Sequence, residues 1–210
     1  MRLGLLGDIH GNAAALRAVL EAARAAGIDT LCLTGDFVGY YYEPDTVLAL
    51  LSSWTCHAVR GNHEDLLQAA RLDPDTRAGY LAKYGSGLEV AMRRLEPPQM
   101  EELAQLPETL TLSIGERSLL LAHGTPWDTD VYLYPDAPVA LMEKVAENEV
   151  DFIVLGHTHY QFDRTVSGRL IINPGSVGHP AIGNRERHGP SWTPKTEQWN
   201  IVVKPMTLQR

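Results

Sequence analysis

Five short polar segments, all rich in metal-binding residue types, each follow a run of residues that predicts a buried β-strand. Strand ends gather along one edge of a parallel sheet, where α/β folds place their functional sites. A glycine flanks each segment and lets the backbone turn sharply. The chain therefore needs a fold that brings five strand ends to one place. The segments are Gly7-Asp8-Ile9-His10, Gly35-Asp36, Gly61-Asn62-His63-Glu64, His123-Gly124 and Gly156-His157-Thr158-His159.

The candidate ligands in these segments offer a mixed set of nitrogen and oxygen donors. Two carboxylates, four imidazoles and one amide oxygen suit Mn, Fe, Zn, Co or Ni better than Ca or Mg, which favour all-oxygen shells. One structural zinc explains them poorly, because such a site closes with four ligands that usually include Cys. We therefore expect two divalent transition-metal ions that share a carboxylate. The candidates are Asp8, His10, Asp36, Asn62, His123, His157 and His159.

Each segment taken alone also has an ordinary structural explanation. An Asp-x-His after a strand is commonly a turn, a Gly-Asn-His is commonly a helix N-terminus, and a His-Thr-His is commonly a pair of surface imidazoles. The combination favours a metal site, because five of the eight histidines fall at these strand ends.

The order of strands and helices predicts the fold class. Strands that alternate with helices in the first third of the chain predict a largely parallel sheet. A helical insertion with breaks at Asp73-Pro74 and Pro97-Pro98 is expected over about residues 64–106, within a single domain spanning residues 1–210. We expect strands at 3–6, 30–34, 56–59, 109–114, 118–122, 152–155, 161–166, 170–172 and 199–203, and further helices at 13–26, 44–51 and 138–148.

Length and charge narrow the classes of function. The 210 residues carry 18 basic and 26 acidic side chains, a formal net charge of −8, without a run of Lys and Arg. We therefore expect no extended nucleic-acid partner. No stretch reaches the about 18 apolar residues that a membrane span needs, and the first residues are too short for a signal-peptide core. We expect a cytoplasmic protein that does not bind membranes; homo-oligomerisation is left open.

The order of the five segments resembles the signature of the calcineurin-like metallophosphoesterase superfamily. The resemblance covers about residues 1–180, and the stretch Asn173-Pro174-Gly175-Ser176-Val177-Gly178 resembles a small prokaryotic branch of phosphodiesterases and phosphatases. It implies a four-layer α/β/β/α sandwich with two central mixed β-sheets. It also implies a first metal bound by Asp8, His10 and His159, a second bound by Asn62, His123 and His157, and Asp36 as the bridge between them.

The same resemblance gives His63 a catalytic role without making it a metal ligand. It implies an imidazole that stabilises charge at the phosphoryl group or protonates the leaving oxygen. One departure concerns the second segment. The Ser/Thr protein phosphatases of the superfamily continue it with an Asp-Arg pair, whereas Phe37-Val38-Gly39-Tyr40 follow Asp36 here. We therefore do not expect protein phosphatase activity.

These observations predict a hydrolase that acts on phosphoric ester bonds through a hydroxide bound by a dinuclear metal centre, with manganese as the favoured ion. The resemblance favours a small phosphodiester, nucleotide-type diesters included, as the substrate. The alternatives are a phosphomonoesterase acting on a small molecule, a non-enzymatic protein-interaction scaffold of the same fold, and a nuclease, which the charge disfavours. The candidate substrate contacts are Arg60, Tyr40 and Arg185. Each also has a structural explanation: Arg60 as a strand-end residue with surface contacts, Tyr40 as packing of a loop and Arg185 as part of a solvated loop.

Overall fold

The first sheet consists of three parallel strands joined by helices. The structure is a computed structural model that describes residues 2–179. Asn12 caps the first helix, since its Oδ1 accepts a hydrogen bond from the Ala15 backbone N–H at 3.0 Å. Pro44 begins the second helix, at a position that needs no N–H donor. The elements are β1 (Leu3–Leu6), α1 (Ala13–Ala25), β2 (Thr30–Leu33), α2 (Pro44–Leu51) and β3 (Thr55–Ala58), with the strand order β1-β2-β3.

The register of this sheet aligns three of the polar segments. Leu6 pairs with Leu33, and Leu33 pairs with Ala58. Because these residues end their strands, the chain leaves all three strands at one edge of the sheet. The segments that begin at Gly7, Gly35 and Gly61 therefore start side by side.

The second sheet is mixed, because two antiparallel hairpins flank a parallel centre. β5 runs parallel to β6, and β6 runs parallel to β8. Leu121 pairs with Val154, so the polar segments after β5 and β6 also begin as neighbours. The strands are β4 (Thr109–Ile114), β5 (Arg117–Ala122), β6 (Phe152–Val154), β7 (Phe162–Val166) and β8 (Arg169–Asn173), in the order β4-β5-β6-β8-β7.

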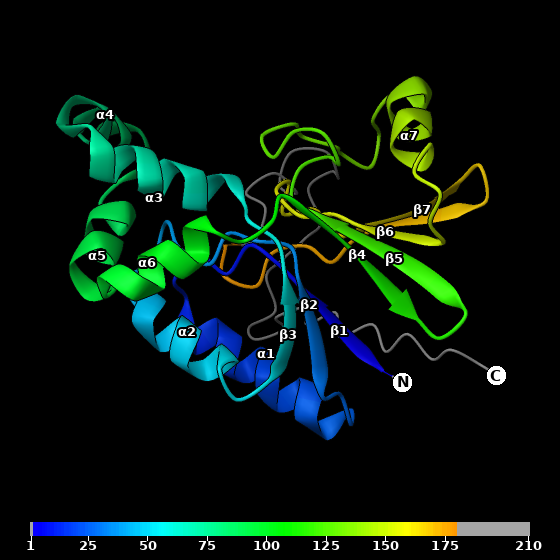
Figure 1. Ribbon diagram of the computed structural model, residues 1–210, viewed down its shortest axis with the longest axis horizontal. Coiled ribbons are helices and arrows are strands. Elements are labelled where there is room, and N and C mark those ends of the chain that lie inside the picture. The colour runs from blue at the N-terminus through cyan, green and yellow to red at the C-terminus, as the bar shows by residue number, and fades with distance from the viewer. Residues whose placement is uncertain (1, 180–210) are drawn as a thin grey trace, which may run out of the picture.

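The two sheets pack face to face between layers of helices (Figure 1). Side chains alternate along β1, so Leu3 and Leu5 face the second sheet while Leu6 packs with the helices. On the far side of the second sheet lies α7 (Val139–Ala146), whose Met142 and Val145 are fully buried. The predicted α/β/β/α sandwich is thus confirmed. Its five-stranded sheet is mixed, whereas the described strands of the three-stranded sheet are parallel throughout.

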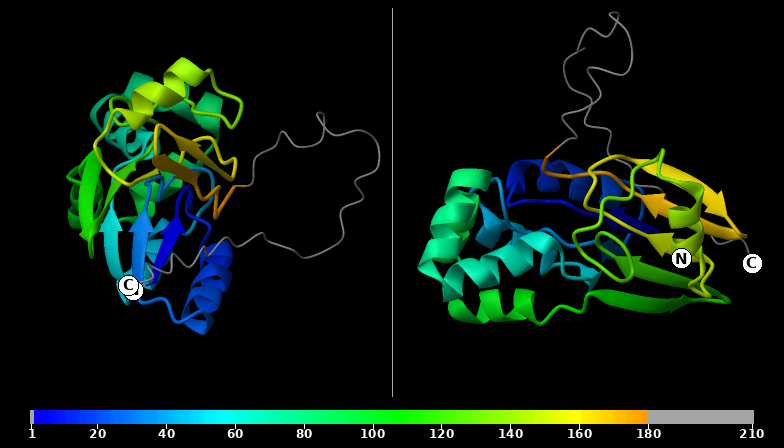
Figure 2. Two further views of the ribbon diagram at one scale, coloured as in Figure 1. Left: turned by 90° about the vertical axis from the view of Figure 1, so that its right-hand side faces the viewer. Right: turned by 90° about the horizontal axis from the view of Figure 1, so that it is seen from above.

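Four helices form the part of the chain that connects the first sheet to the second. They gather at one end of the molecule (Figures 1 and 2). Two of the breaks between them fall at the predicted prolines. A third break, at Gly85-Ser86, was not predicted; Gly85 adopts a φ of 77°, which ends the helix before it. The helices are α3 (Asn62–Leu72), α4 (Pro74–Tyr84), α5 (Gly87–Arg94) and α6 (Pro97–Ala104).

The remaining observed boundaries lie within about two residues of the predicted ones, as expected for frayed element ends. The predicted strand at 199–203 lies outside the described residues. None of the helices described over residues 2–179 combines the length and the apolar character that a membrane crossing requires. The extent of the domain beyond the described part stays a prediction.

Candidate metal centre

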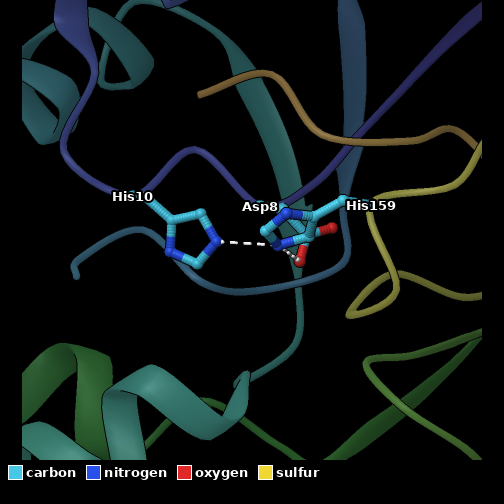
Figure 3. A group of neighbouring side chains, drawn as sticks. All are labelled: Asp8, His10 and His159. Carbon is cyan, nitrogen blue, oxygen red and sulfur yellow. Dashed lines mark hydrogen bonds and ion pairs between the residues drawn. The ribbon is translucent and has the colours of Figure 1, made fainter. Parts of the chain in front are cut away.

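The first cluster of donor atoms joins the segment after β1 to the segment after β6. Asp8, His10 and His159 place their ligand atoms within 4.8 Å of one another. His10 Nε2 lies 3.0 Å from His159 Nε2, which in turn lies 3.3 Å from Asp8 Oδ1 (Figure 3). These are the three residues for which the sequence predicts a shared metal.

The second cluster joins the segments after β2, β5 and β6. Asp36, His123 and His157 also hold their ligand atoms within 4.8 Å. Asn62 Oδ1 lies 3.1 Å from His123 Nε2 and so belongs to this group. Asp36 Oδ2 is 3.4 Å from His123 Nε2 and 3.7 Å from His10 Nε2. Asp36 therefore stands between the two clusters, at the predicted bridging position.

The backbone at these residues is strained. Within residues 2–179 six non-glycine residues have a positive φ, and five of them are candidate ligands. Such conformations cost L-residues roughly 1–2 kcal/mol each and persist where the surrounding structure holds them for a function. The backbone thus gives evidence for a site that is independent of the motif. The five are Asp8 (54°), His10 (53°), Asp36 (57°), His157 (67°) and His159 (60°).

Backbone carbonyls orient two of the imidazoles. His123 Nδ1 donates to the Thr34 carbonyl at 2.6 Å, and His10 Nδ1 donates to the Val38 carbonyl at 3.1 Å. Each bond fixes the proton on Nδ1 and turns Nε2 toward the clusters, as second-shell partners of metal-binding histidines do. Burial lowers the pKa of His10 to about 3, which leaves its Nε2 lone pair free for a metal.

The donor set fits divalent cations. His157 Nε2 is buried without a hydrogen-bond partner among the described residues, which is unfavourable unless a further group binds it. Burial opposes the charged form of His123, but the negative charge of Asp36 outweighs it and raises the pKa of His123 to about 10. In the metal-free protein a proton therefore lies near Asp36, where a cation would displace it.

His63 lies beside both clusters at the start of α3. Its backbone N–H donates to Asp36 Oδ1 at 2.9 Å, and its ring centre is 4.6 Å from that of His10. Its Nδ1 is buried and has no partner in the described part of the chain. A side chain on Gly39 would come within 2.4 Å of this Nδ1, so the loop needs glycine there. Burial lowers the pKa of His63, against the charge of Asp36, and favours a neutral imidazole.

Sequence reasoning missed the role of Glu64. Its buried carboxylate accepts hydrogen bonds from the backbone N–H groups of Asp36 at 2.8 Å, Phe37 at 2.9 Å, Val38 at 3.2 Å and Gly61 at 3.0 Å. The side chain thereby ties the loop that carries Asp36 to the first turn of α3. It is a positioning residue for the second cluster.

We expect Glu64→Gln to destabilise the metal-free protein by about 3 kcal/mol, because an amide nitrogen would face buried N–H donors that then lack an acceptor. Urea unfolding of the metal-free protein measures this loss. Glu101→Gln, an exposed substitution of the same kind on α6, should change the stability by less than about 0.5 kcal/mol. Equal unfolding midpoints for the two variants would refute the positioning role.

The candidate substrate contacts have different outcomes. Arg60 does not line the cavity beside the metal clusters: its guanidinium donates to the carbonyls of Ala104 at 3.0 Å and Leu106 at 3.2 Å and pairs with Asp65 at 2.6 Å and Glu108 at 2.9 Å. Carbonyls at and after the end of α6 and two carboxylates therefore bind this side chain, and its phosphate contact stays a prediction. Arg185 lies outside the described residues.

Tyr40 lines a cavity of about 330 Å³ that opens beside both clusters, at the lower end of the range of small-molecule sites. Asp36, Asn62, His63, His157 and His159 line it too. Four further tyrosines in the lining, Tyr84, Tyr132, Tyr134 and Tyr160, were not predicted from the sequence. Asp130 was not predicted either: it lies outside the lining, and its Oδ1 accepts a hydrogen bond from Asn62 Nδ2 at 3.2 Å.

The stretch 173–178 ties the first and last polar segments together. Asn173 Nδ2 donates to the Gly156 carbonyl at 2.6 Å, and Ser176 Oγ donates to the Asp8 carbonyl at 2.8 Å. The Gly178 backbone N–H also donates to the Asp8 carbonyl. The stretch therefore holds the turns of Asp8 and His157, which explains its place in the motif pattern.

A sandwich of this topology, with histidine and carboxylate clusters at its strand ends, defines a class of metal-binding phosphoesterases. The chain belongs to the calcineurin-like phosphoesterase superfamily, whose domain matches residues 1–189. The resemblance seen in the five segments is thereby confirmed.

The chain is also similar to individual proteins over most of its length. The uncharacterized protein MJ0912 of Methanocaldococcus jannaschii is 30% identical over 200 residues, which cover 86% of this chain and 78% of the relative. The structure of the hypothetical protein PH1004 from Pyrococcus horikoshii is 25% identical, with a TM-score of 0.72 and coverage of 85% and 78%. A metallophosphoesterase from Sphaerobacter thermophilus is 26% identical, with a TM-score of 0.68 and coverage of 87% and 80%.

Proposed function

We propose that this protein hydrolyses a small phosphodiester with the help of two divalent transition-metal ions. The observation that carries the proposal is the position of one carboxylate, Asp36, between two sets of donors. Asp8, His10 and His159 lie on one side of it, and Asn62, His123 and His157 lie on the other. Membership in a phosphoesterase superfamily supports the reaction class, and the similarity to a metallophosphoesterase from Sphaerobacter thermophilus agrees with it.

The residues that would hold the ions follow from the clusters. Two ions would supply Lewis-acid activation of water and charge neutralisation at phosphorus. Mixed nitrogen and oxygen donors accept Mn, Fe, Zn, Co or Ni, and among these we propose manganese as the physiological ion. Asp8, His10 and His159 would bind one ion, Asn62, His123 and His157 the other, and Asp36 both.

The chain itself supplies the proton chemistry. His63 lines the cavity, and we propose that its imidazole exchanges a proton with bound substrate. Burial favours the neutral imidazole, so His63 would have to gain a proton before it could donate to the oxygen that leaves phosphorus or stabilise the negative charge of the phosphoryl oxygens. His63 thus acts on substrate, whereas Glu64 acts through Asp36 and Gly61.

The charge of the cavity supports a diester over a monoester. None of the residues that line it within the described part of the chain is Lys or Arg. A phosphomonoester at neutral pH carries up to two negative charges, whereas a phosphodiester carries one. A site whose positive charge comes from the metals alone matches the diester better.

Hydrolysis of a paired aryl phosphodiester and aryl phosphomonoester tests the proposal. Metal-stripped protein, resupplied in turn with Mn, Co, Ni, Zn or Mg, should cleave the diester faster than the monoester, and Asp36→Asn should cleave neither. Preferred cleavage of the monoester would establish a phosphatase instead. Metal binding without cleavage of either ester would favour the protein-interaction scaffold.

A further inference from the structure

Tyrosines crowd the cavity beside the metal clusters. They come from four separate parts of the chain: the loop after β2, the end of α4, the loop between β5 and α7, and the turn after β6. Aromatic rings from distant segments converge here without being covered by the core. The five are Tyr40, Tyr84, Tyr132, Tyr134 and Tyr160.

The loop between β5 and α7 presents two of these rings as a stacked pair. Tyr132 and Tyr134 have ring centres 5.7 Å apart and planes inclined by only 14°. Leu133 between them is 1% exposed and anchors the loop in the core, whereas Tyr132 is 51% and Tyr134 39% exposed. Anchoring of the loop therefore does not account for the two exposed rings.

Tyr132 also reaches the candidate metal centre. Its ring centre lies 3.9 Å from that of His157, and Tyr134 in turn packs edge-on against Tyr160 at 5.6 Å. A phosphoester bound at the metals would thus place its substituent against a continuous aromatic wall. Tyrosines that stay partly exposed in a cavity favour planar aromatic partners, which pack against them with little loss of conformational entropy.

The charges around the cavity disfavour a ligand that carries a second strongly anionic group in addition to the phosphoester. Asp130 does not line the cavity, but it places its Oδ1 3.7 Å from Nε2 of the lining residue His157 and so adds a negative charge beside it. The nearby Lys83 is exposed and holds its Nζ over the Tyr84 ring, 4.6 Å from the ring centre, without lining the cavity. A nucleoside polyphosphate would therefore lack a described cationic partner in the lining, whereas an uncharged ring would be matched.

We propose that these tyrosines bind a planar aromatic ring carried by the phosphoester, with Tyr132 as the main stacking partner. The inference rests on the proposed function and names the substrate class: a phosphodiester with an aryl or nucleobase substituent. Stacking of one ring on an aromatic side chain strengthens binding by about tenfold or more.

Calorimetric titration with non-hydrolysable phosphonates tests the inference without requiring turnover. Phenylphosphonate and methylphosphonate share the metal-binding group and differ in the ring. We expect manganese-loaded protein to bind phenylphosphonate about tenfold more tightly. Tyr132→Phe should keep this ratio, and Tyr132→Leu should reduce it to about twofold or less. Trp127→Leu removes a 40% exposed ring of the same loop that does not line the cavity, and should leave the ratio unchanged.

The inference would be overturned if the original protein bound phenylphosphonate and methylphosphonate with equal affinity. It would also be overturned if the tenfold ratio of these affinities persisted in Tyr132→Leu. Because Tyr132 contacts His157, the metal content of each variant is measured as well, and Tyr134→Leu replaces Tyr132→Leu if metal is lost. A tenfold ratio in a protein that cleaves no ester would reject the proposed function alone, whereas cleavage without any ratio would reject the aromatic site alone. The carbon-linked phosphonate isostere of AMP distinguishes the two sources: tighter binding than phenylphosphonate identifies a nucleobase, and equal or weaker binding identifies a small aryl group.

Discussion

Asp36→Asn is expected to abolish hydrolysis and to release metal from both clusters. Asparagine keeps the shape of the side chain, and its oxygen can still accept the hydrogen bond from the His63 backbone N–H. It removes the negative charge that lies 3.7 Å from His10 Nε2 and 3.4 Å from His123 Nε2. Loss of a supporting partner of a metal ligand costs about 10- to 100-fold in metal affinity, and loss of a shared ligand should cost more.

Metal content after dialysis and the rate of diester cleavage measure this effect together. Asp29→Asn removes the same charge from an exposed loop position and should behave like the original protein in both assays. An Asp36→Asn protein that retains its ions and its turnover would show that this carboxylate bridges nothing.

His63→Ala is expected to lower kcat by about 10² to 10⁴ while the ions remain bound. His63 lines the cavity, which fits a group that acts on substrate. Its nitrogen also lies within 4.8 Å of donors on His10 and Asp36, so metal content must be measured beside kcat. His57→Ala is the matched control, because it removes an imidazole from β3 that does not line the cavity.

The leaving group separates the two roles open to His63. If the imidazole protonates the leaving oxygen, the loss should be smaller for a nitrophenyl ester, whose leaving group needs little protonation, than for an alkyl ester. If it stabilises the phosphoryl oxygens, both esters should lose alike. Metal loss equal to that of Asp36→Asn would reassign His63 as a ligand.

The sequence predicted the gathering of donors because parallel strands fix where their ends lie. Once β1, β2 and β3 are recognised, pairing of Leu6, Leu33 and Ala58 brings the following turns together. Glycines beside the ligands agree with this: a side chain on Gly61 would come within 2.2 Å of Asp36 Oδ1. The assignment of individual ligand roles stays a prediction until metal is bound.

Contacts between segments distant in sequence could not be predicted in the same way. Nothing in the spacing of Glu64 shows that its carboxylate reaches the backbone of residues 36–38, 26 to 28 positions earlier. Arg60 directly precedes the polar segment at Gly61, yet helix-end carbonyls and acidic side chains bind its guanidinium. The loop that carries Tyr132 and Tyr134 has no periodic pattern that would aim its rings at the site.

The most direct test of the central claim is a manganese titration of metal-free protein followed by electron paramagnetic resonance. Binding should saturate at two ions per chain, and the spectrum should become that of a spin-coupled pair, because ions that share a carboxylate lie about 3.5 to 4 Å apart. Saturation at one ion, or two ions without coupling, would contradict a dinuclear centre bridged by Asp36.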